Sequence, residues 1–156
     1  MLICMSSKYV EQEIAYNFGK LPPSLLPILD KKLIEFQNDL ASTSEPKIVT
    51  LPSDFKISVA LENFILAMGY SIILIDPNLS LNSAILELLN KLEPTENLKL
   101  IFGDTLVGLP KDVKDRKDFI LVSKDNKTYN WCFVEEAETK LIFLRLNTLM
   151  KLILLY

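Results

Sequence analysis

The sequence predicts a single α/β domain in which a mostly parallel sheet is covered by helices on both faces. Short apolar runs alternate with segments of helical periodicity between residues 2 and 102. The runs are continuous stretches of apolar residues, which is typical of strands that are buried on both faces. Such an alternation favours right-handed crossovers and a three-layer α/β/α arrangement. A chain of 156 residues has the length of one domain, which we expect to span residues 1–156.

The N-terminal region combines a strand, a turn, a helix and a proline-rich loop. A first strand is expected at residues 2–5, followed by a polar turn at residues 6–8. Residues 9–18 predict a short helix that Gly19 ends. Three prolines lie between residues 22 and 27. Because proline fixes φ and lacks an N–H, this segment is predicted as a stiff, extended loop.

Three further helices and three further strands follow in alternation. The helices are predicted from apolar residues that recur at i, i+3, i+4 and i+7. They cover residues 32–40, 59–68 and 81–92. The strands that alternate with them lie at residues 47–51, 71–75 and 98–102. Gly69 and Pro94 stand where the second and third of these helices have to stop.

The C-terminal region gives a less regular pattern. Residues 119–122 and 129–134 predict two more strands, the second of them antiparallel to its neighbours. Residues 141–146 are expected to form a strand, and residues 147–156 a terminal helix. The leucine-rich segment 141–156 is shorter than a membrane-spanning helix and contains charged residues. It is therefore expected in the core or in an interface, where it could form a homodimer.

Composition excludes several classes of function. The formal net charge is −3, so the overall field does not favour a nucleic acid as partner. Histidine is absent, which excludes Ser-His-Asp, Cys-His and His-ligated zinc chemistry from this chain. The apolar stretch at residues 1–5 is too short for a secretory signal or a membrane span. These observations predict a cytoplasmic protein whose chemistry depends on carboxylates, lysines, backbone amides or an oxygen-bound metal.

The stretch LKLIFGDTLVGLP, from residue 98 to residue 110, carries the most informative candidate residue. Its apolar run stops at Gly103, and Asp104 follows where a buried strand is expected to end. Ligands bind at this carboxyl edge of open α/β sheets, and a carboxylate there can hold Mg²⁺. The glycine would let backbone and ligand approach closely. A turn aspartate that satisfies local amides is an equally good reading of Asp104 on these residues alone.

Two further groups are candidates for phosphate binding. Ser6, Ser7 and Lys8 follow the first strand, which is the position of phosphate-binding loops in nucleotide-binding folds. They contain no glycine and match neither G-x-G-x-x-G nor the P-loop pattern. Lys31 and Lys32 open the helix predicted at residues 32–40 and could bind phosphate. Two exposed surface lysines are the simpler reading.

Five stretches of the chain together carry a resemblance to a known family: CMSSKYVEQEIAYNFG from residue 4, PPSLLPILDKKLIE from residue 22, GDT from residue 103, DFILVS from residue 118 and YNWCFVE from residue 129. They resemble the sugar-nucleotide nucleotidyltransferases, and most of all a divergent branch associated with capsule and other surface polysaccharides. The resemblance covers nearly the whole chain. It implies a Rossmann-like, glycosyltransferase-A-like fold.

The resemblance also implies a reaction and a set of site residues. The phosphate of a sugar 1-phosphate would attack the α-phosphorus of an NTP with Mg²⁺ as cofactor, and pyrophosphate would leave. By the same resemblance, Asp104 corresponds to the metal-binding aspartate of the family's GD motif, next to Gly103. Lys31 corresponds to a lysine that contacts phosphate or substrate, and Ser6, Ser7 and Lys8 occupy the place of the nucleotide-binding loop.

The sequence departs from the family in several places, and two departures bear on the site. The glycine-rich loop ending in arginine that usually follows the first strand is missing. The chain also stops about where the family's second half would begin, and that half normally supplies a second metal-binding aspartate. Two hypotheses follow, an enzyme and a catalytically degenerate domain that serves as a binding or assembly module. A generic Rossmann-like regulatory domain is a third, which requires Asp104 to be buried and fully hydrogen-bonded.

Overall fold

A computed structural model describes residues 1–42, 44–92 and 98–106 in full. Beyond residue 106 it describes the backbone of four strands, at residues 119–123, 130–137, 140–147 and 151–155. The helix stop expected at Pro94 and the strand start expected at Tyr129 lie outside the described residues.

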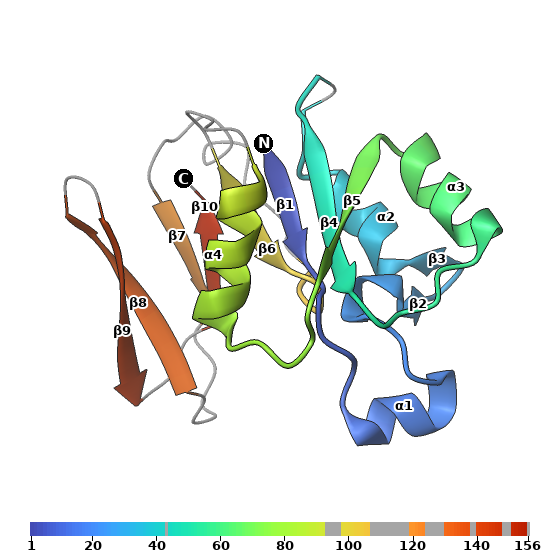
Figure 1. Cartoon of the computed structure of the whole chain (residues 1–156), viewed down its shortest axis with the longest axis horizontal. Coiled ribbons are helices and arrows are strands. Elements are labelled where there is room, and N and C mark those ends of the chain that lie inside the picture. The colour runs from blue at the N-terminus through green and yellow to red at the C-terminus, as the bar shows by residue number, and fades with distance from the viewer. Residues whose placement is uncertain are drawn as a thin grey trace.

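The core of the fold is a six-stranded sheet with the strand order β5-β4-β1-β6-β10-β7 (Figure 1). Its strands are β1 (Leu2–Met5), β4 (Lys47–Pro52), β5 (Tyr70–Ile75), β6 (Lys99–Phe102), β7 (Phe119–Ser123) and β10 (Lys151–Leu155). The pairs β1–β4, β1–β6 and β4–β5 are parallel, whereas β10 is antiparallel to both β6 and β7. The predicted α/β class with a mostly parallel sheet is therefore confirmed.

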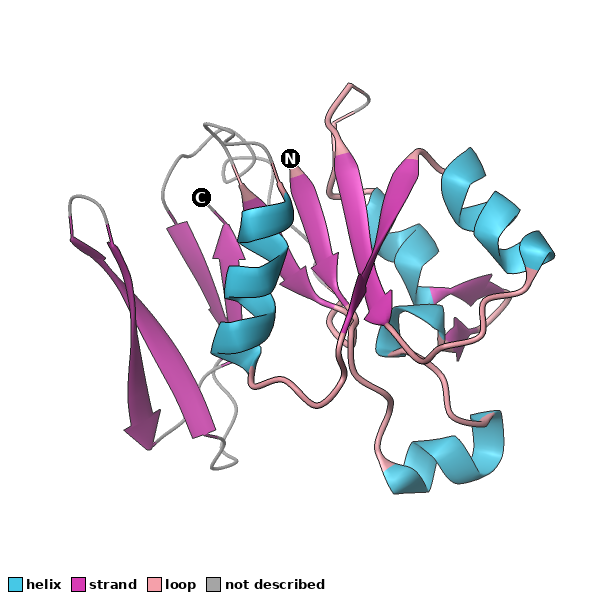
Figure 2. Ribbon diagram, in the orientation of Figure 1, coloured by secondary structure: helices cyan, strands magenta, loops and turns pink. Residues whose placement is uncertain are grey.

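Helices cover both faces of this sheet (Figure 2). They are α2 (Leu33–Asn38), α3 (Val59–Ala67) and α4 (Leu81–Lys91). Alternate side chains of β1 pack on opposite faces of the sheet, because successive side chains of a strand point in opposite directions. Ile3 packs with Leu88 of α4 in one core, and Leu2 packs with Ile34 and Ile65 of α2 and α3 in the other. This two-sided burial is the reason why the strands are largely apolar.

The ends of the helices follow their capping residues. Ser58 and Ser80 accept hydrogen bonds from backbone N–H groups in the first turns of α3 and α4. Gly69 has φ 82° just beyond α3, as the sequence predicted. The ammonium of Lys47 donates to the Met68 carbonyl there and to Asn38 Oδ1 at 2.8 Å, and so links the ends of α3 and α2.

The segment from Pro22 to Lys32 differs from its prediction as an extended loop followed by a helix. Residues Pro23–Leu25 form a 3₁₀ turn, and β2 (Pro27–Ile28) pairs with β3 (Lys31–Lys32) as a short antiparallel ribbon. Leu29 has φ 57° in the turn of this ribbon. Because the chain reverses here, α2 starts at Leu33, one residue later than predicted. The Lys32 N–H donates to the Glu35 carboxylate at 2.7 Å and so closes the first turn of the helix.

The C-terminal prediction was partly wrong. Residues Lys151–Leu155 form β10, and the expected terminal helix at residues 147–156 is absent from this described stretch. Pairing with β6 on one side and β7 on the other satisfies the backbone of the strand, and a short apolar run fits either structure by pattern alone. The strands β8 (Asn130–Ala137) and β9 (Lys140–Asn147) are antiparallel, as expected, but they form a separate hairpin. A homodimer through the segment 141–156 stays a prediction.

Helix α1 (Gln12–Phe18) stands apart from the sheet (Figure 1). All of its residues are described, and none of its side chains is buried. Hydrogen bonds hold the segments at its two ends: the Val10 N–H donates to the Leu21 carbonyl at 3.0 Å, and the Tyr9 hydroxyl donates to Asp54 Oδ1 at 2.7 Å. Desolvation and the bond to Asp54 raise the pKa of Tyr9 to about 12, so Tyr9 keeps the proton that it donates.

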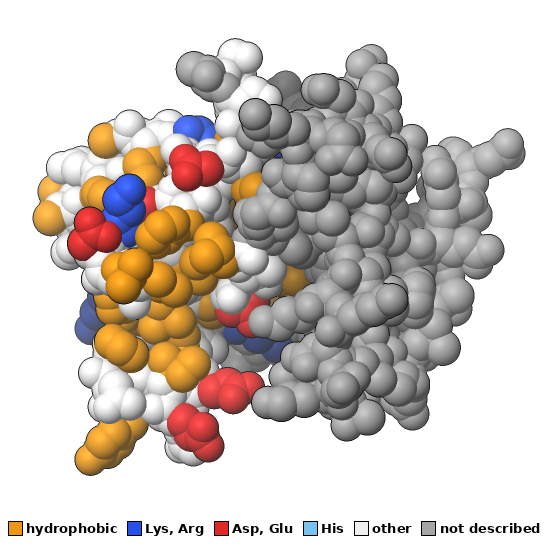
Figure 3. Space-filling model, turned by 180° about the vertical axis from the view of Figure 1, so that it is seen from behind, with side chains coloured by type: hydrophobic (Ala, Val, Ile, Leu, Met, Phe, Trp, Pro, Cys, Tyr) orange, Lys and Arg blue, Asp and Glu red, His pale blue; other side chains and the backbone are white. Residues whose placement is uncertain are grey.

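Apolar side chains also reach the surface (Figure 3). The face seen there, opposite to the view of Figure 1, carries hydrophobic side chains in the middle of its described part, with acidic and basic side chains around them. Among the fully described residues, Leu29 is 94% exposed and Val59 is 72% exposed. Within the described residues, no helix has both the length and the hydropathy that crossing a bilayer requires.

An ion-pair cluster lies around Glu45. Its carboxylate lies 2.8 Å from Lys99 Nζ and 3.2 Å from the Met1 amino nitrogen. Desolvation raises the pKa of Glu45, but hydrogen bonds from Lys99, from the Ser42 N–H and from the amino group outweigh it and lower the pKa below its ordinary value. A lowered pKa stabilises the folded state at neutral pH, and this stability is lost as the pH falls through the folded-state pKa.

We therefore expect Glu45→Gln to lower the free energy of unfolding by about 1 kcal/mol at pH 7. The difference should shrink below about pH 4, where the wild-type carboxylate becomes protonated and resembles the amide. Urea unfolding of both proteins at pH 7 and pH 3 measures this. An equal difference at both pH values would contradict the electrostatic explanation.

Candidate functional site

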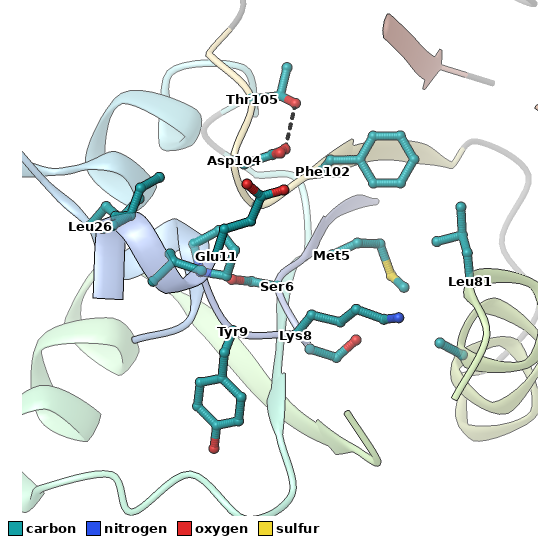
Figure 4. Close-up of a pocket in the computed structure, with 16 residues that line it drawn as sticks. Met5, Ser6, Lys8, Tyr9, Glu11, Leu26, Leu81, Phe102, Asp104 and Thr105 are labelled. Atoms are coloured by element: carbon teal, nitrogen blue, oxygen red, sulfur yellow. Dashed lines mark hydrogen bonds between the residues drawn. The ribbon is translucent and has the colours of Figure 1, made fainter. Parts of the chain in front are cut away.

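A cavity of about 450 Å³ lies at the carboxyl ends of β1 and β6 (Figure 4). Its walls come from the segment after β1, the start of α1, the proline-rich loop, the first turn of α4 and the turn after β6. Parallel strands place their carboxyl ends at one edge of the sheet, which explains why residues distant in sequence meet here. The structure therefore has a cavity at the edge of the sheet where the sequence predicted a ligand to bind.

Asp104 lies on the cavity wall with an exposed side chain. The Thr105 hydroxyl donates to its Oδ1 at 3.0 Å. A carboxylate that is open to solvent does not fit the reading of a buried, fully hydrogen-bonded turn residue. The condition for a generic regulatory domain, a buried and fully hydrogen-bonded Asp104, is thus not met. The metal-binding role of Asp104 stays a prediction.

The turn that carries Asp104 continues the sheet beyond its last strand residue. The Gly103 N–H donates to the Met5 carbonyl at 2.7 Å, and the Thr105 N–H donates to the Phe102 carbonyl at 3.0 Å. A Cβ atom on Gly103 would lie 2.6 Å from Ser6 Oγ. The glycine therefore allows two chain segments to approach closely. A nucleotide contact at Gly103 stays a prediction.

The polar turn after β1 has two different parts. Ser6 is buried, its N–H donates to Thr50 Oγ1 at 2.9 Å, and its hydroxyl accepts the Ser24 N–H at 3.0 Å. These bonds join β1, β4 and the proline-rich loop. Ser7 is also buried, whereas Lys8 is exposed, and both line the cavity. Lys8 is thus the member of the predicted loop that is free to meet an anion.

Lys31 does not line this cavity. It lies in the β2–β3 ribbon, is exposed, and places its Nζ 5.7 Å from the centre of the Phe36 ring. The other predicted site residues meet at the cavity, so the structure separates Lys31 from Asp104 and Lys8. A phosphate contact at Lys31 stays a prediction that this arrangement does not support directly.

Glu11 is a cavity residue that the sequence did not single out. In Figure 4 its carboxylate points toward Asp104. The sequence placed this residue inside the short helix predicted at residues 9–18, and no catalytic or binding motif marks it. In the described part of the chain, no three carboxylate or thiol side chains gather closely enough to hold a metal by themselves. A cation here would need further oxygen ligands from a phosphate or from water.

The comparisons with known proteins identify the fold. The sequence matches no family model and no curated protein. A CTP:phosphocholine cytidylyltransferase from Streptococcus pneumoniae has a similar structure, with a TM-score of 0.60 and 14% sequence identity. The match covers 98% of this chain and 67% of that chain. The chain has a nucleotidyltransferase-like fold. At this identity the likeness shows the fold alone, so the assignment to a capsule branch stays a prediction.

The charges on the wall of the cavity favour a cation together with an anion. Among the described residues that line it, Lys8 carries a positive charge, and Glu11 and Asp104 carry negative charges, which leaves a net charge of −1. Two carboxylates repel a bare phosphate. A phosphate that brings a divalent cation satisfies the carboxylates with the metal and Lys8 with its own oxygens.

Proposed function

We propose that this nucleotidyltransferase-like domain binds an NTP with Mg²⁺ and transfers the nucleotidyl group to a sugar 1-phosphate, in capsular or other surface-polysaccharide biosynthesis. One observation carries the proposal: an exposed Asp104 faces a cavity at the carboxyl edge of the parallel strands. In the reaction, an oxygen of the sugar 1-phosphate attacks the α-phosphorus of the NTP. A new P–O bond forms, the bond to the β-phosphate breaks, and pyrophosphate leaves.

The residues present fit Mg²⁺. This ion prefers oxygen ligands, often one or two carboxylates together with substrate phosphates and waters. Asp104, with Glu11 as the second carboxylate on the same wall, supplies such donors. Bound there, Mg²⁺ would neutralise charge on the phosphates.

The chain's other residues position and shield the reactants. Lys8 is placed to bind a phosphate oxygen as a point charge. Apolar residues on the wall, including Leu26, Leu81 and Phe102, reduce the water around the phosphates, which strengthens electrostatic contacts. This chemistry consists mainly of positioning and electrostatics, so a chain without histidine can perform it.

A second candidate is a domain that binds the nucleotide without turnover and serves as a binding or assembly module. The observation that favours it is the single lysine among the described lining residues, with Lys31 outside the cavity. Transfer of a nucleotidyl group develops charge that cationic side chains usually help to stabilise. The two candidates share the binding step and differ in the release of pyrophosphate.

Calorimetry and a pyrophosphate assay test both candidates. The structural neighbour is named for CTP and phosphocholine, so CTP is the first nucleotide to titrate, followed by ATP, GTP and UTP. Phosphocholine is the alternative acceptor beside a set of sugar 1-phosphates. We expect binding of one NTP with Mg²⁺ and none with EDTA. Binding with pyrophosphate release supports the transferase, binding alone supports the module, and no binding contradicts both.

Exchange of the two candidate lysines identifies the phosphate contact. We expect Lys8→Met to weaken binding of the Mg²⁺–nucleotide about 10-fold, because a lysine facing the cavity loses its charge. Lys31→Met is the matched variant, since the resemblance favours Lys31 and the geometry favours Lys8. Isothermal titration of both variants measures the difference. A larger loss for Lys31→Met than for Lys8→Met would show that the geometry points to the wrong lysine.

A further inference from the structure

The side chain of Gln37 joins α2 to the turn that carries Asp104. Gln37 is fully buried. Its Nε2 lies 3.2 Å from the carbonyl oxygen of Phe102, 3.1 Å from that of Gly103 and 2.9 Å from that of Thr105. These three carbonyls belong to the residues on both sides of Asp104. One side-chain amide therefore contacts backbone carbonyls that come before and after Asp104.

The other end of the same amide is anchored in the sheet. The Cys4 thiol of β1 donates to Gln37 Oε1 at 2.9 Å. Burial raises the pKa of the Cys4 thiol, so the thiol keeps the proton that it donates. Since this bond fixes which end of the amide faces Cys4, the NH₂ group must face the carbonyls. The amide orientation is thus determined from both sides.

The contacts of Gln37 restrict the backbone on both sides of Asp104. With the carbonyls of Phe102, Gly103 and Thr105 drawn inward to one amide, the peptide planes on both sides of Asp104 have little freedom to rotate. Asp104 itself contributes no carbonyl contact to Gln37 and places its side chain on the exposed side of the turn. The turn therefore directs three backbone carbonyls toward Gln37 and the Asp104 carboxylate toward solvent.

We infer that Gln37 is a positioning residue for the Asp104 carboxylate: it holds the turn after β6 so that this carboxylate faces the cavity. Gln37 is not among the described residues that line the cavity. The inference rests on the proposed function, in which Asp104 binds the cation. It adds a residue of α2 to the determinants of that binding.

Metal affinity, measured in protein that is shown to be folded, separates positioning from a purely structural role. The probe is Mn²⁺, followed by electron paramagnetic resonance, with circular dichroism and thermal unfolding on the same samples. Gln37→Met keeps the length of the side chain and removes both polar ends. Gln37→Glu keeps the shape and the acceptor for Cys4, but sets an oxygen against the three carbonyls. Asn38→Ala is the matched control, because the neighbouring amide on α2 holds Lys47 and has no bond to the turn.

We expect Mn²⁺ binding to weaken at least 10-fold in Gln37→Met and in Gln37→Glu, and less than twofold in Asn38→Ala. If Gln37→Met does not fold, Gln37→Glu decides, since it fills the same space. Folded Gln37 variants with wild-type Mn²⁺ affinity would overturn the inference. Asp104→Asn is measured beside them: if it keeps wild-type affinity, the metal role of Asp104 and this inference both fall. Loss in Asp104→Asn without loss in the Gln37 variants overturns the inference alone.

Discussion

Replacement of Asp104 by asparagine is expected to weaken Mg²⁺-dependent nucleotide binding about 100-fold while the protein stays folded. The amide keeps an oxygen that can accept the bond from the Thr105 hydroxyl, so the turn is preserved. It loses the negative charge that a hard cation requires. A 100-fold loss corresponds to about 2.8 kcal/mol of binding free energy. Calorimetry with Mg²⁺ and the nucleotide that the wild-type protein binds measures the effect.

Asp76→Asn is the matched control for this experiment. Asp76 follows β5 at the same edge of the sheet, is exposed, and also belongs to a turn, where its Oδ1 accepts the Asn78 N–H at 2.9 Å. It does not line the cavity. We expect its variant to bind like the wild type. Equal losses in the two variants would mean that a general effect of charge, and not a ligand at Asp104, explains the result.

Gly103→Ala is expected to lower the free energy of unfolding by about 3 kcal/mol. The new Cβ would lie 2.6 Å from Ser6 Oγ, 2.7 Å from Ser6 Cβ and 3.0 Å from the Met5 carbonyl oxygen. Ser6 cannot move away at low cost, because it is buried and its hydroxyl accepts the Ser24 N–H. Urea unfolding measures the change. Gly19→Ala is the control, since Gly19 has φ 79° and no atom near its added Cβ, so only backbone strain of about 1 kcal/mol is expected.

A double-mutant cycle tests the cause of this destabilisation. In a Ser6→Gly background the two closest contacts of the added Cβ disappear, and the contact with the Met5 carbonyl remains. The penalty of Gly103→Ala should then fall by more than half, which gives a coupling energy between the two sites. Additive losses in the double variant would show that the clash with Ser6 is not the reason.

Much of the fold could be predicted because its parallel strands are visible in the sequence as short apolar runs. The parallel strands β1, β4, β5 and β6 are largely apolar runs between breaks in the pattern, and each was predicted to within about one residue of its observed bounds. The few polar residues inside them, such as Thr50 in β4 and Ser71 in β5, did not hide the pattern. Helix α3 was predictable for a similar reason, because Gly69 ends its apolar periodicity.

Other elements depend on contacts with distant segments or on an unusual turn, which a local sequence pattern does not reveal. β10 has the apolar run of either a helix or a strand, and what decides is the pair of neighbours, β6 and β7, distant in sequence. The β2–β3 ribbon depends on the turn at Leu29, whose φ of 57° is unusual for a side chain that is not glycine. Local residue preferences could not predict that turn.

The candidate site was partly predictable. Asp104, Gly103 and the turn from Ser6 to Lys8 meet at the cavity because they follow adjacent parallel strands, which the sequence revealed. Glu11 was missed, since the path of the chain beyond the turn brings it there. Gln37 did leave a signal: it stands three residues after Ile34 on the apolar face of its helix. A polar residue in such a place has to find a partner inside the protein.

The exposed position of α1 has a consequence for how any ligand would bind. A helix of seven residues is far too short to persist in water by itself, and α1 gains no stability from buried side chains. Its population in solution must therefore depend on the hydrogen bonds that hold the segments at its two ends, and a substantial coil fraction is expected. Because Glu11 and Ile14 belong to the cavity wall, a molecule that touches them also shifts this helix–coil balance. Affinity at this wall would then include an entropic cost of ordering, which a rigid wall would not impose.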